Sequence, residues 1–154
     1  MACIHLIYNV PVWYYTSSSP WKISYDELGN KTTMLKKDMA RSFLQMAWSG
    51  AVFEAYEKYI HPDFIHHNAY FKGERETLLR GMDESARQFP DKQCEILRAL
   101  EDGDLVAVHS KVALDPEQVY AVIHIFRFED EKIIEEWESA QEVPKDSPNE
   151  NGIF

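Results

Sequence analysis

Residues 118–142 read QVYAVIHIFRFEDEKIIEEWESAQE, and their pattern is the strongest indication of the fold. Apolar and aromatic side chains alternate with polar ones on both sides of a Glu-Asp-Glu turn, which predicts a β-hairpin. The same period of two residues appears before this stretch, where Asp102-Gly103 is a typical hairpin turn. We therefore expect an antiparallel meander of four strands, at about 92–101, 104–113, 118–128 and 132–142.

The chain before this meander has a helical period instead. Apolar residues recur every three or four positions, as they do on one face of a helix. The pattern predicts three helices and one short extended piece: Thr32 or Thr33 to about Trp48, 51–60, 74–89 and, extended, 64–68. Helices followed by strands indicate an α+β domain in which the helices cover one face of a twisted sheet. Such an arrangement leaves a cone-shaped cavity that suits a small ligand.

Composition and charge restrict the class of protein. The chain has 154 residues, of which 45% are hydrophobic, and this fits one folded domain. The formal net charge of -10 disfavours nucleic acid and anionic membrane surfaces as partners. No segment has the apolar length of a membrane span, and the two cysteines form neither a disulfide framework nor a CxxC site. We therefore expect a soluble protein of the reducing, cytoplasmic compartment.

The N-terminal part differs from the rest of the chain. Residues 1–31 are predicted to be an extension, because Pro11, Pro20 and Gly29 interrupt any long element there. Residues 32–154 are predicted to form the pocket domain. The extension is either a docked arm or a loose tail, and its many aromatic residues favour docking.

One face of the last hairpin carries the candidate chemistry. Because side chains alternate along a strand, His124, Phe126 and Phe128 share a face. The residues that join them from the last strand depend on the turn near Asp130, since a register change of one residue exchanges the whole face. In either register, a histidine and a glutamate share an otherwise aromatic face. This pairing suits proton transfer, although each residue also has a simpler structural or solvated role.

The two turn lengths give different neighbours for the histidine. A two-residue turn would place Glu135 and Trp137 beside His124. A three-residue turn would place Glu136 and Glu138 there instead. The residue pattern alone leaves both alternatives open.

A second candidate is the segment His66-His67-Asn68. Neighbouring histidines on an extended segment point to opposite faces, so only one of them can enter the pocket. Asn68 lies on the same face as His66, and its amide could hold a carbonyl or enolate oxygen. No HxH or HxxxH spacing connects these histidines to His109 or His124, so no metal site is expected.

Three segments of the chain resemble a known family. They are YIHPDFIHHN at 59–68, IHIFRF at 123–128 followed by KIIEEWE at 132–138, and the tail from Gln141 to Phe154. In their order and spacing they are similar to the SnoaL-like polyketide cyclases of the nuclear transport factor two-like superfamily. The resemblance extends over roughly residues 34–154 and implies a conical barrel made of a curved antiparallel sheet and three N-terminal helices.

The resemblance also implies roles for individual residues. In cyclases of this type, a pocket histidine lies fourteen residues before a catalytic acid, and His124 and Glu138 have that spacing. This favours the three-residue turn, even though the family's turn glycine is Glu131 here. The implied catalytic residues are Glu138, His124 and Asn68, and the implied substrate contacts are His66, Phe126, Glu136, Trp48 and Phe43. Neither a cofactor nor a metal is implied, and a homodimer is expected through the convex face of the sheet.

Two functions follow from these expectations. The first is a cofactor-free enzyme that performs aldol-type proton transfer on a small apolar or carbonyl-containing molecule. Asparagine at position 68 argues against steroid isomerisation by a carboxylate base at that position. The alternative is a domain that binds a small ligand, or serves in assembly, without turnover.

Overall fold

The computed structural model describes residues 24–25, 31–32 and 34–154, which fall into two compact units, Met1–Thr33 and Met34–Phe154. In the first unit, β1 (Ser24–Tyr25) and β2 (Lys31–Thr32) pair as antiparallel strands. The docking expected for the aromatic residues of the extension concerns residues outside the described ones. The predicted boundary between the extension and the pocket domain stays a prediction.

Three helices form where the apolar period predicts them: α1 (Lys36–Trp48), α2 (Val52–Tyr59) and α3 (Arg75–Gln88). The predicted cap of α1 at Thr32 or Thr33 is wrong, because Leu35 occupies the N-cap position and makes no side-chain cap. The stripe on α1 that includes Phe43 is buried as the period implies. No helix in the described residues is long and apolar enough to cross a membrane.

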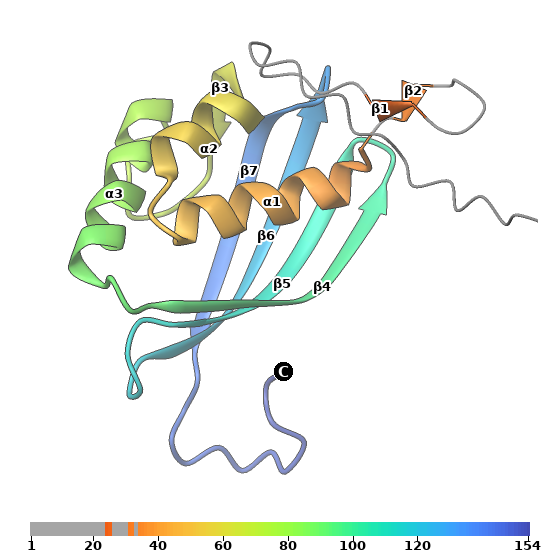
Figure 1. Ribbon diagram of the computed structural model, residues 1–154. Helices are drawn as coiled ribbons and strands as arrows, with labels where there is room; N and C mark the ends of the chain where they lie inside the picture. Colours follow the sequence, from red (N-terminus) through yellow and green to blue (C-terminus); the bar gives the residue numbers. More distant parts are fainter. Residues whose placement is uncertain (1–23, 26–30, 33) are drawn as a thin grey trace, which may run out of the picture. The chain divides into compact units, whose positions relative to one another are not determined.

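The sheet has five strands: β3 (Ile60–His66), β4 (Gln93–Asp102), β5 (Leu105–Ala113), β6 (Val119–Glu129) and β7 (Lys132–Glu142). Strands β4 to β7 form the predicted antiparallel meander, and the predicted α+β class is confirmed. The prediction of only four strands is wrong, because β3 joins the open edge of β7 as a parallel strand (Figure 1). The sheet is therefore open, with β3 and β4 as its two edges.

The hairpin between β6 and β7 has an unexpected register. Its turn has two residues, Asp130 and Glu131, with φ values of 45° and 66°. Positive φ at both positions matches the right-handed twist of a hairpin, even though glycine adopts it at lower cost. The preferred three-residue turn is therefore wrong.

A β-bulge on β7 nevertheless produces the face expected from the longer turn. Phe128 pairs with Ile133, but the next residue, Arg127, pairs with Glu135, so Ile134 is an extra residue on β7. Beyond the bulge the side chains of β7 have exchanged faces. Glu136 and Glu138 therefore point to the concave side.

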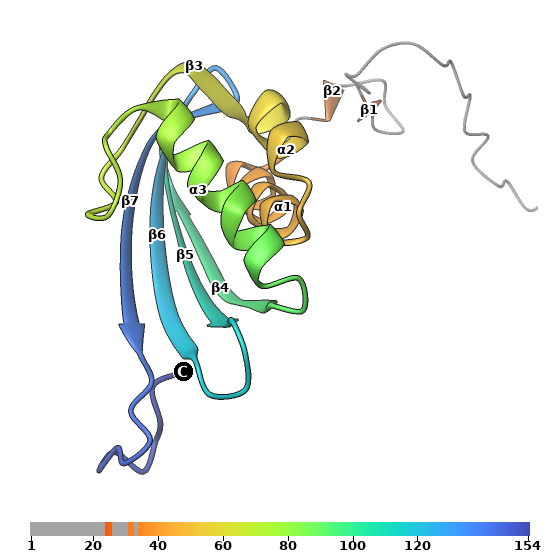
Figure 2. The same ribbon diagram turned by 90° about the vertical axis from the view of Figure 1, so that its left-hand side faces the viewer.

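The three helices lie against one side of the curved sheet (Figure 2). Phe43 of α1 packs edge-on against Phe126 of β6, with ring centroids 5.9 Å apart, and both side chains are fully buried. In the described residues, no helix covers the opposite, convex side, where Ile123 and Ile125 remain 40% and 38% exposed. The helices and the concave face together enclose the core and leave space for a site at its margin.

Candidate active site

One histidine and two glutamates meet on the concave face. His124 of β6 is the register partner of Glu138 of β7, and Glu136 lies one pleat away on the same strand. The Nε2 atom of His124 lies 3.7 Å from Oε2 of Glu138 and 3.8 Å from Oε1 of Glu136. Both distances are longer than a hydrogen bond, so the imidazole nitrogen can still bind a ligand oxygen between the two carboxyl groups.

Aromatic rings hold this imidazole in place. The His124 ring stacks on Phe126 with a centroid distance of 5.6 Å and an interplanar angle of 8°. The ring of Trp48, the last residue of α1, is tilted by 57° relative to the same imidazole, and the two ring centroids are 6.0 Å apart. These contacts fix the ring and remove most of the water around it, since the His124 side chain is only 7% exposed. The cluster therefore lies in an apolar environment that disfavours charge.

Burial changes the protonation of the three groups. It lowers the pKa of His124 to about 4. Burial, with the nearby charge of Glu138, raises the pKa of Glu136 to about 8. The pKa of Glu138 is also raised by burial, but a hydrogen bond from the Asn68 side chain acts against this, and 27% of the Glu138 side chain is exposed. At neutral pH we therefore expect a neutral imidazole and a protonated Glu136, and Glu138 is the more readily ionised of the two carboxyl groups.

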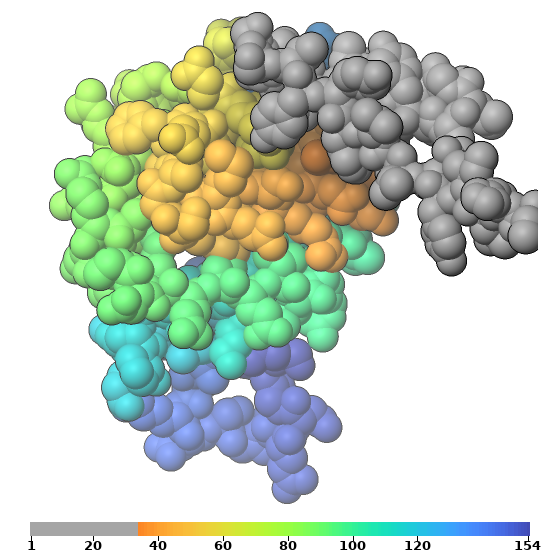
Figure 3. All heavy atoms as spheres, in the orientation of Figure 1, coloured from red at the N-terminus to blue at the C-terminus, as the bar shows by residue number. Residues whose placement is uncertain are grey.

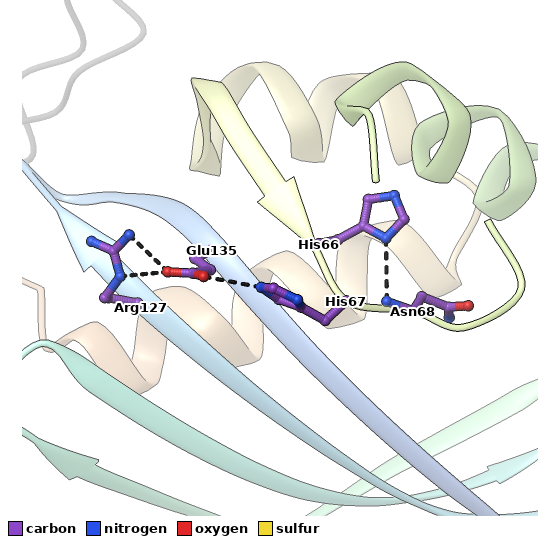
Figure 4. A network of polar contacts seen from close by, with 5 residues as sticks. All are labelled: His66, His67, Asn68, Arg127 and Glu135. Atoms are coloured by element: carbon purple, nitrogen blue, oxygen red, sulfur yellow. Dashed lines mark hydrogen bonds and ion pairs between the residues drawn. The ribbon is translucent and has the colours of Figure 1, made fainter. Parts of the chain in front are cut away.

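The loop after β3 positions Asn68. The backbone N–H of Asn68 donates to Nδ1 of His66 at 3.3 Å, and its side-chain oxygen accepts from the backbone N–H of Tyr70 at 2.9 Å. Because the oxygen is engaged, the amide NH₂ group is the end of the side chain left for Glu138. Figure 4 shows this contact between the ring of the buried His66 and the backbone of Asn68, two residues later.

The neighbouring histidine points away from the site. His67 stacks face to face on Trp137, with centroids 5.0 Å apart, and its Nε2 lies 3.0 Å from Oε1 of Glu135. Arg127 donates to the other oxygen of Glu135 at 2.8 Å (Figure 4). Hydrogen bonds from His67 and Arg127 hold the pKa of Glu135 below its ordinary value. This network joins the loop after β3 to β7 and β6, and it holds His67 away from the cavity.

A cavity of about 290 Å³ opens beside the cluster. Figure 3 shows a hollow between the end of α1 and the segment that connects α3 to β4. The lining residues are Ala47, Trp48, Asn68, Tyr70, Phe71, Leu78, Gly81, Met82, Ser85, Lys92, His124, Glu136 and Glu138. This size suits a small organic molecule, and both apolar and polar side chains line the wall.

The structure brings together five of the eight residues chosen from the sequence. Trp48, Asn68, His124, Glu136 and Glu138 line the cavity. The other three, Phe43, His66 and Phe126, are buried outside this lining and support it from the core.

The sequence analysis missed the lining residues of α3 and the loops on either side of it. Lys92, Ser85 and Tyr70 are the polar examples. Helical period shows which residues of α3 share a face, but it does not show which residues of that face border a cavity. Close packing is visible only in the fold: a Cβ atom at Gly81 would lie 2.4 Å from the ring of Phe71, so a larger residue there would displace this ring.

The cluster also has the donors of a cation site. The ligand atoms of His124, Glu136 and Glu138 all lie within 4.8 Å of one another. A divalent cation would need both carboxyl groups ionised, whereas burial favours a proton on Glu136. A cation would therefore compete with this proton, and without a cation the cluster supports proton transfer.

Comparisons with known proteins agree with this architecture. The family model described as the SnoaL-like domain matches residues 40–136. None of the curated proteins searched matches the chain.

Solved structures share the fold at low sequence identity. IdmH, a candidate polyketide cyclase from Streptomyces antibioticus, is 20% identical with a TM-score of 0.58 over 70% of this chain and 93% of its own. AclR, a candidate hydroxylase from Streptomyces galilaeus, is 19% identical with a TM-score of 0.60 over 69% of this chain and 88% of its own. A SnoaL-like protein of unknown function from Burkholderia thailandensis is 16% identical with a TM-score of 0.58 over 69% and 93%. Similarity at this level shows the fold alone.

Proposed function

Because the chain belongs to the SnoaL-like domain family, we propose that it is a small-molecule enzyme that transfers a proton next to a carbonyl group, as in an aldol-type cyclisation. The observation that carries this proposal is that the carboxyl groups of Glu138 and Glu136 lie 3.7 and 3.8 Å from Nε2 of His124, in the lining of one cavity. Burial raises the pKa of Glu136 to about 8, whereas at Glu138 the hydrogen bond from Asn68 acts against the rise, so the two groups can serve as hydrogen-bond donor and base at the same pH. The chemistry needs only protein side chains.

The proposed reaction begins at Glu138. Its carboxylate takes a proton from the carbon next to the substrate carbonyl, and the electron pair moves onto the carbonyl oxygen. The O–H of Glu136 and the Nε2–H of neutral His124 donate hydrogen bonds to this enolate oxygen. The proton of His124 belongs on Nε2, because that nitrogen faces the carboxyl groups while Nδ1 is buried without a hydrogen-bond partner in the described residues.

Ring closure completes the proposed cycle. The enolate carbon bonds to a second carbonyl carbon of the same molecule, whose oxygen becomes an alkoxide and takes the proton from Glu138. The carboxylate of Glu138 is thereby regenerated. Asn68 keeps this carboxylate ionised and oriented through its amide, and its second N–H is available to a substrate oxygen.

Hydrogen–deuterium exchange tests the proposal without knowledge of the product. Proton NMR in D₂O can follow loss of the signal next to the carbonyl in a panel of β-ketoesters and polyketide-like carbonyl compounds. With a substrate from this panel, Glu138→Gln should slow the exchange by roughly 10²–10⁴-fold and leave binding nearly unchanged. Glu142→Gln, at the exposed end of the same strand, is the matched control. Tight binding of a compound with no exchange above the buffer rate would instead indicate a ligand-binding domain.

We also propose that the protein pairs as a homodimer through the convex face of the sheet. Ile123 and Ile125 form exposed apolar positions there, on strand β6. A two-fold contact would bury the same residues in both copies.

A further inference from the structure

Lys92 is an ammonium group in the wall of the cavity. It lies between α3 and β4, where its backbone N–H donates to the carbonyl oxygen of Phe89 at 3.2 Å. Its Nζ donates to Oγ of Ser85 at 3.3 Å, and both side chains line the cavity. Among the lining residues it is the only lysine or arginine. The proposed reaction assigns it no role.

This ammonium group has no carboxylate partner. In the described part of the chain, no Asp or Glu oxygen lies within ion-pair distance of Lys92, whereas the exposed Lys36 pairs with Asp104 at 2.6 Å. The ionisable group that acts on it is the thiol of Cys94, whose own pKa is raised by burial, so this thiol is neutral. Burial has the opposite effect on the ammonium group and lowers the pKa of Lys92. A partly desolvated cation with only a hydroxyl partner leaves its charge uncompensated, and a ligand anion can compensate it.

The acidic cluster lies on the other side of the same cavity. Strand β7, which carries Glu136 and Glu138, and strand β4, which begins directly after Lys92, are separated by β6 and β5. Through the register partners of β6 and β5, Glu138 is level with Ala99 of β4, which is seven residues after Lys92. The two groups therefore arise apart across the sheet, by about 14 Å at 4.8 Å per strand, and also along the strand direction. A ligand anion is repelled by the Glu138 carboxylate and attracted by the ammonium group, so the charge distribution gives such a ligand one orientation.

We propose that the substrate carries a carboxylate that Lys92 and Ser85 bind, with its reacting carbonyl directed toward Glu138. This inference rests on the proposed function, since it names the substrate class of the same site: a carbonyl compound that is also a carboxylic acid. A carboxylate fits better than a phosphate monoester. One ammonium and one hydroxyl can neutralise a single negative charge, and the lining offers no guanidinium for a dianion.

A pair of matched probes tests the anion site without turnover. The probes are 2-naphthoate and its neutral amide, 2-naphthamide, and isothermal titration calorimetry measures their affinities. The wild-type protein should bind the acid at least about 10-fold more tightly than the amide, as expected for a charge-assisted contact. Lys92→Met should bring the two affinities together by weakening only the acid, and Lys92→Arg should retain the preference. Lys72→Met, which removes an exposed charge outside the lining, is the control and should change nothing.

Several outcomes would overturn the assignment. Equal affinity of the wild type for acid and amide would do so, and so would a preference that survives in Lys92→Met. Tighter binding of 2-naphthyl phosphate than of 2-naphthoate would reject the carboxylate. A covalent mass increase at Lys92 after borohydride treatment with a ketone would instead identify an imine-forming nucleophile.

The proposed function can fail separately from this inference. Glu138→Gln should keep the preference for the acid while it loses proton exchange. A protein that discriminates the probes but exchanges no proton would retain the anion site without the catalytic role.

Discussion

Replacing Glu136 by glutamine tests the electrostatics of the buried cluster without a substrate. Glutamine keeps the shape of the side chain and cannot ionise. Burial raises the pKa of Glu136 to about 8 in the folded protein, whereas the unfolded chain ionises this group near the ordinary 4.5. The variant therefore removes one titration from the folded state, and the change in stability depends on pH.

The sign and size of the effect follow from these two values. Between pH 4.5 and pH 8 the unfolded chain has released the Glu136 proton, while the folded chain still holds it. The free energy of unfolding of the wild type therefore falls as pH rises through this interval and levels off above it. Because each pKa unit corresponds to about 1.4 kcal/mol, the full loss is about 5 kcal/mol. The free energy of unfolding of Glu136→Gln should exceed that of the wild type by up to ~5 kcal/mol at pH 8 and by less than about 1 kcal/mol at pH 5.

His124 changes the free energy of unfolding with pH in the opposite direction. Burial lowers its pKa from 6.5 to about 4, so the unfolded chain binds a proton first as pH falls. Stability from this group is therefore complete above pH 6.5 and is lost as pH falls toward 4. The same histidine is present in the wild type and in Glu136→Gln. Its contribution largely cancels when the two proteins are compared at one pH.

Urea unfolding followed by tryptophan fluorescence provides the measurement. Curves at pH 5, 6.5 and 8 give the free energy of unfolding of each protein. Glu131→Gln, in the exposed turn, is the matched control and should show no difference that grows with pH. If Glu136→Gln changes stability equally at pH 5 and pH 8, then Glu136 titrates like an exposed glutamate, and the reasoning about the cluster is refuted.

Four other changes test separate parts of the structure. Asn68→Ala removes the hydrogen bond that favours the Glu138 carboxylate, so the acidic limb of the exchange rate should move to higher pH; an unchanged pH profile would contradict this role. Deleting Ile134 removes only the bulged residue, so the variant should retain exchange activity. A loss of exchange activity in this variant would show that the bulge itself positions Glu136 and Glu138. Phe126→Ala should lower the free energy of unfolding by about 3–5 kcal/mol in urea, because the ring is fully buried, and a loss below 1 kcal/mol would argue against tight packing. Ile125→Asp should convert a dimer to a monomer by light scattering, and a wild type that is already monomeric at micromolar concentration would remove the dimer proposal.

The sequence predicts the meander well because its signals are local. Alternation of apolar and polar residues and the Asp102-Gly103 turn are properties of neighbouring residues, and β4 to β7 begin and end within about two residues of the prediction. Only the second part of β3 was predicted, as the extended piece at 64–68, because the residues before it, His61-Pro62-Asp63, have the composition of a helix end. Its pairing with β7 depends on contacts between distant parts of the chain, which no local pattern contains.

In the candidate site, too, the features set by neighbouring residues were predicted and those set by distant contacts were not. The alternation on β6 identifies His124 as a residue of the aromatic face, and the spacing of the family motif identifies Glu138 as its partner. The reason for their pairing was wrong, because the sequence around Ile134 carries no signal for a bulge. Lys92 was not chosen, since its importance comes from its position in a cavity wall and from the absence of a carboxylate partner in the described residues.

The extra residue at Ile134 also affects how this chain should be aligned with relatives whose hairpin is regular. Such relatives have one residue fewer between the turn and the inward-facing acids. An alignment without a gap there would match Glu136 with an outward position of the relative and Trp137 with an inward one. A one-residue gap placed before Glu135 restores the equivalence of the two acidic positions. A comparison of this chain with a relative of that kind therefore depends on counting residues from the strand pairing rather than from the turn.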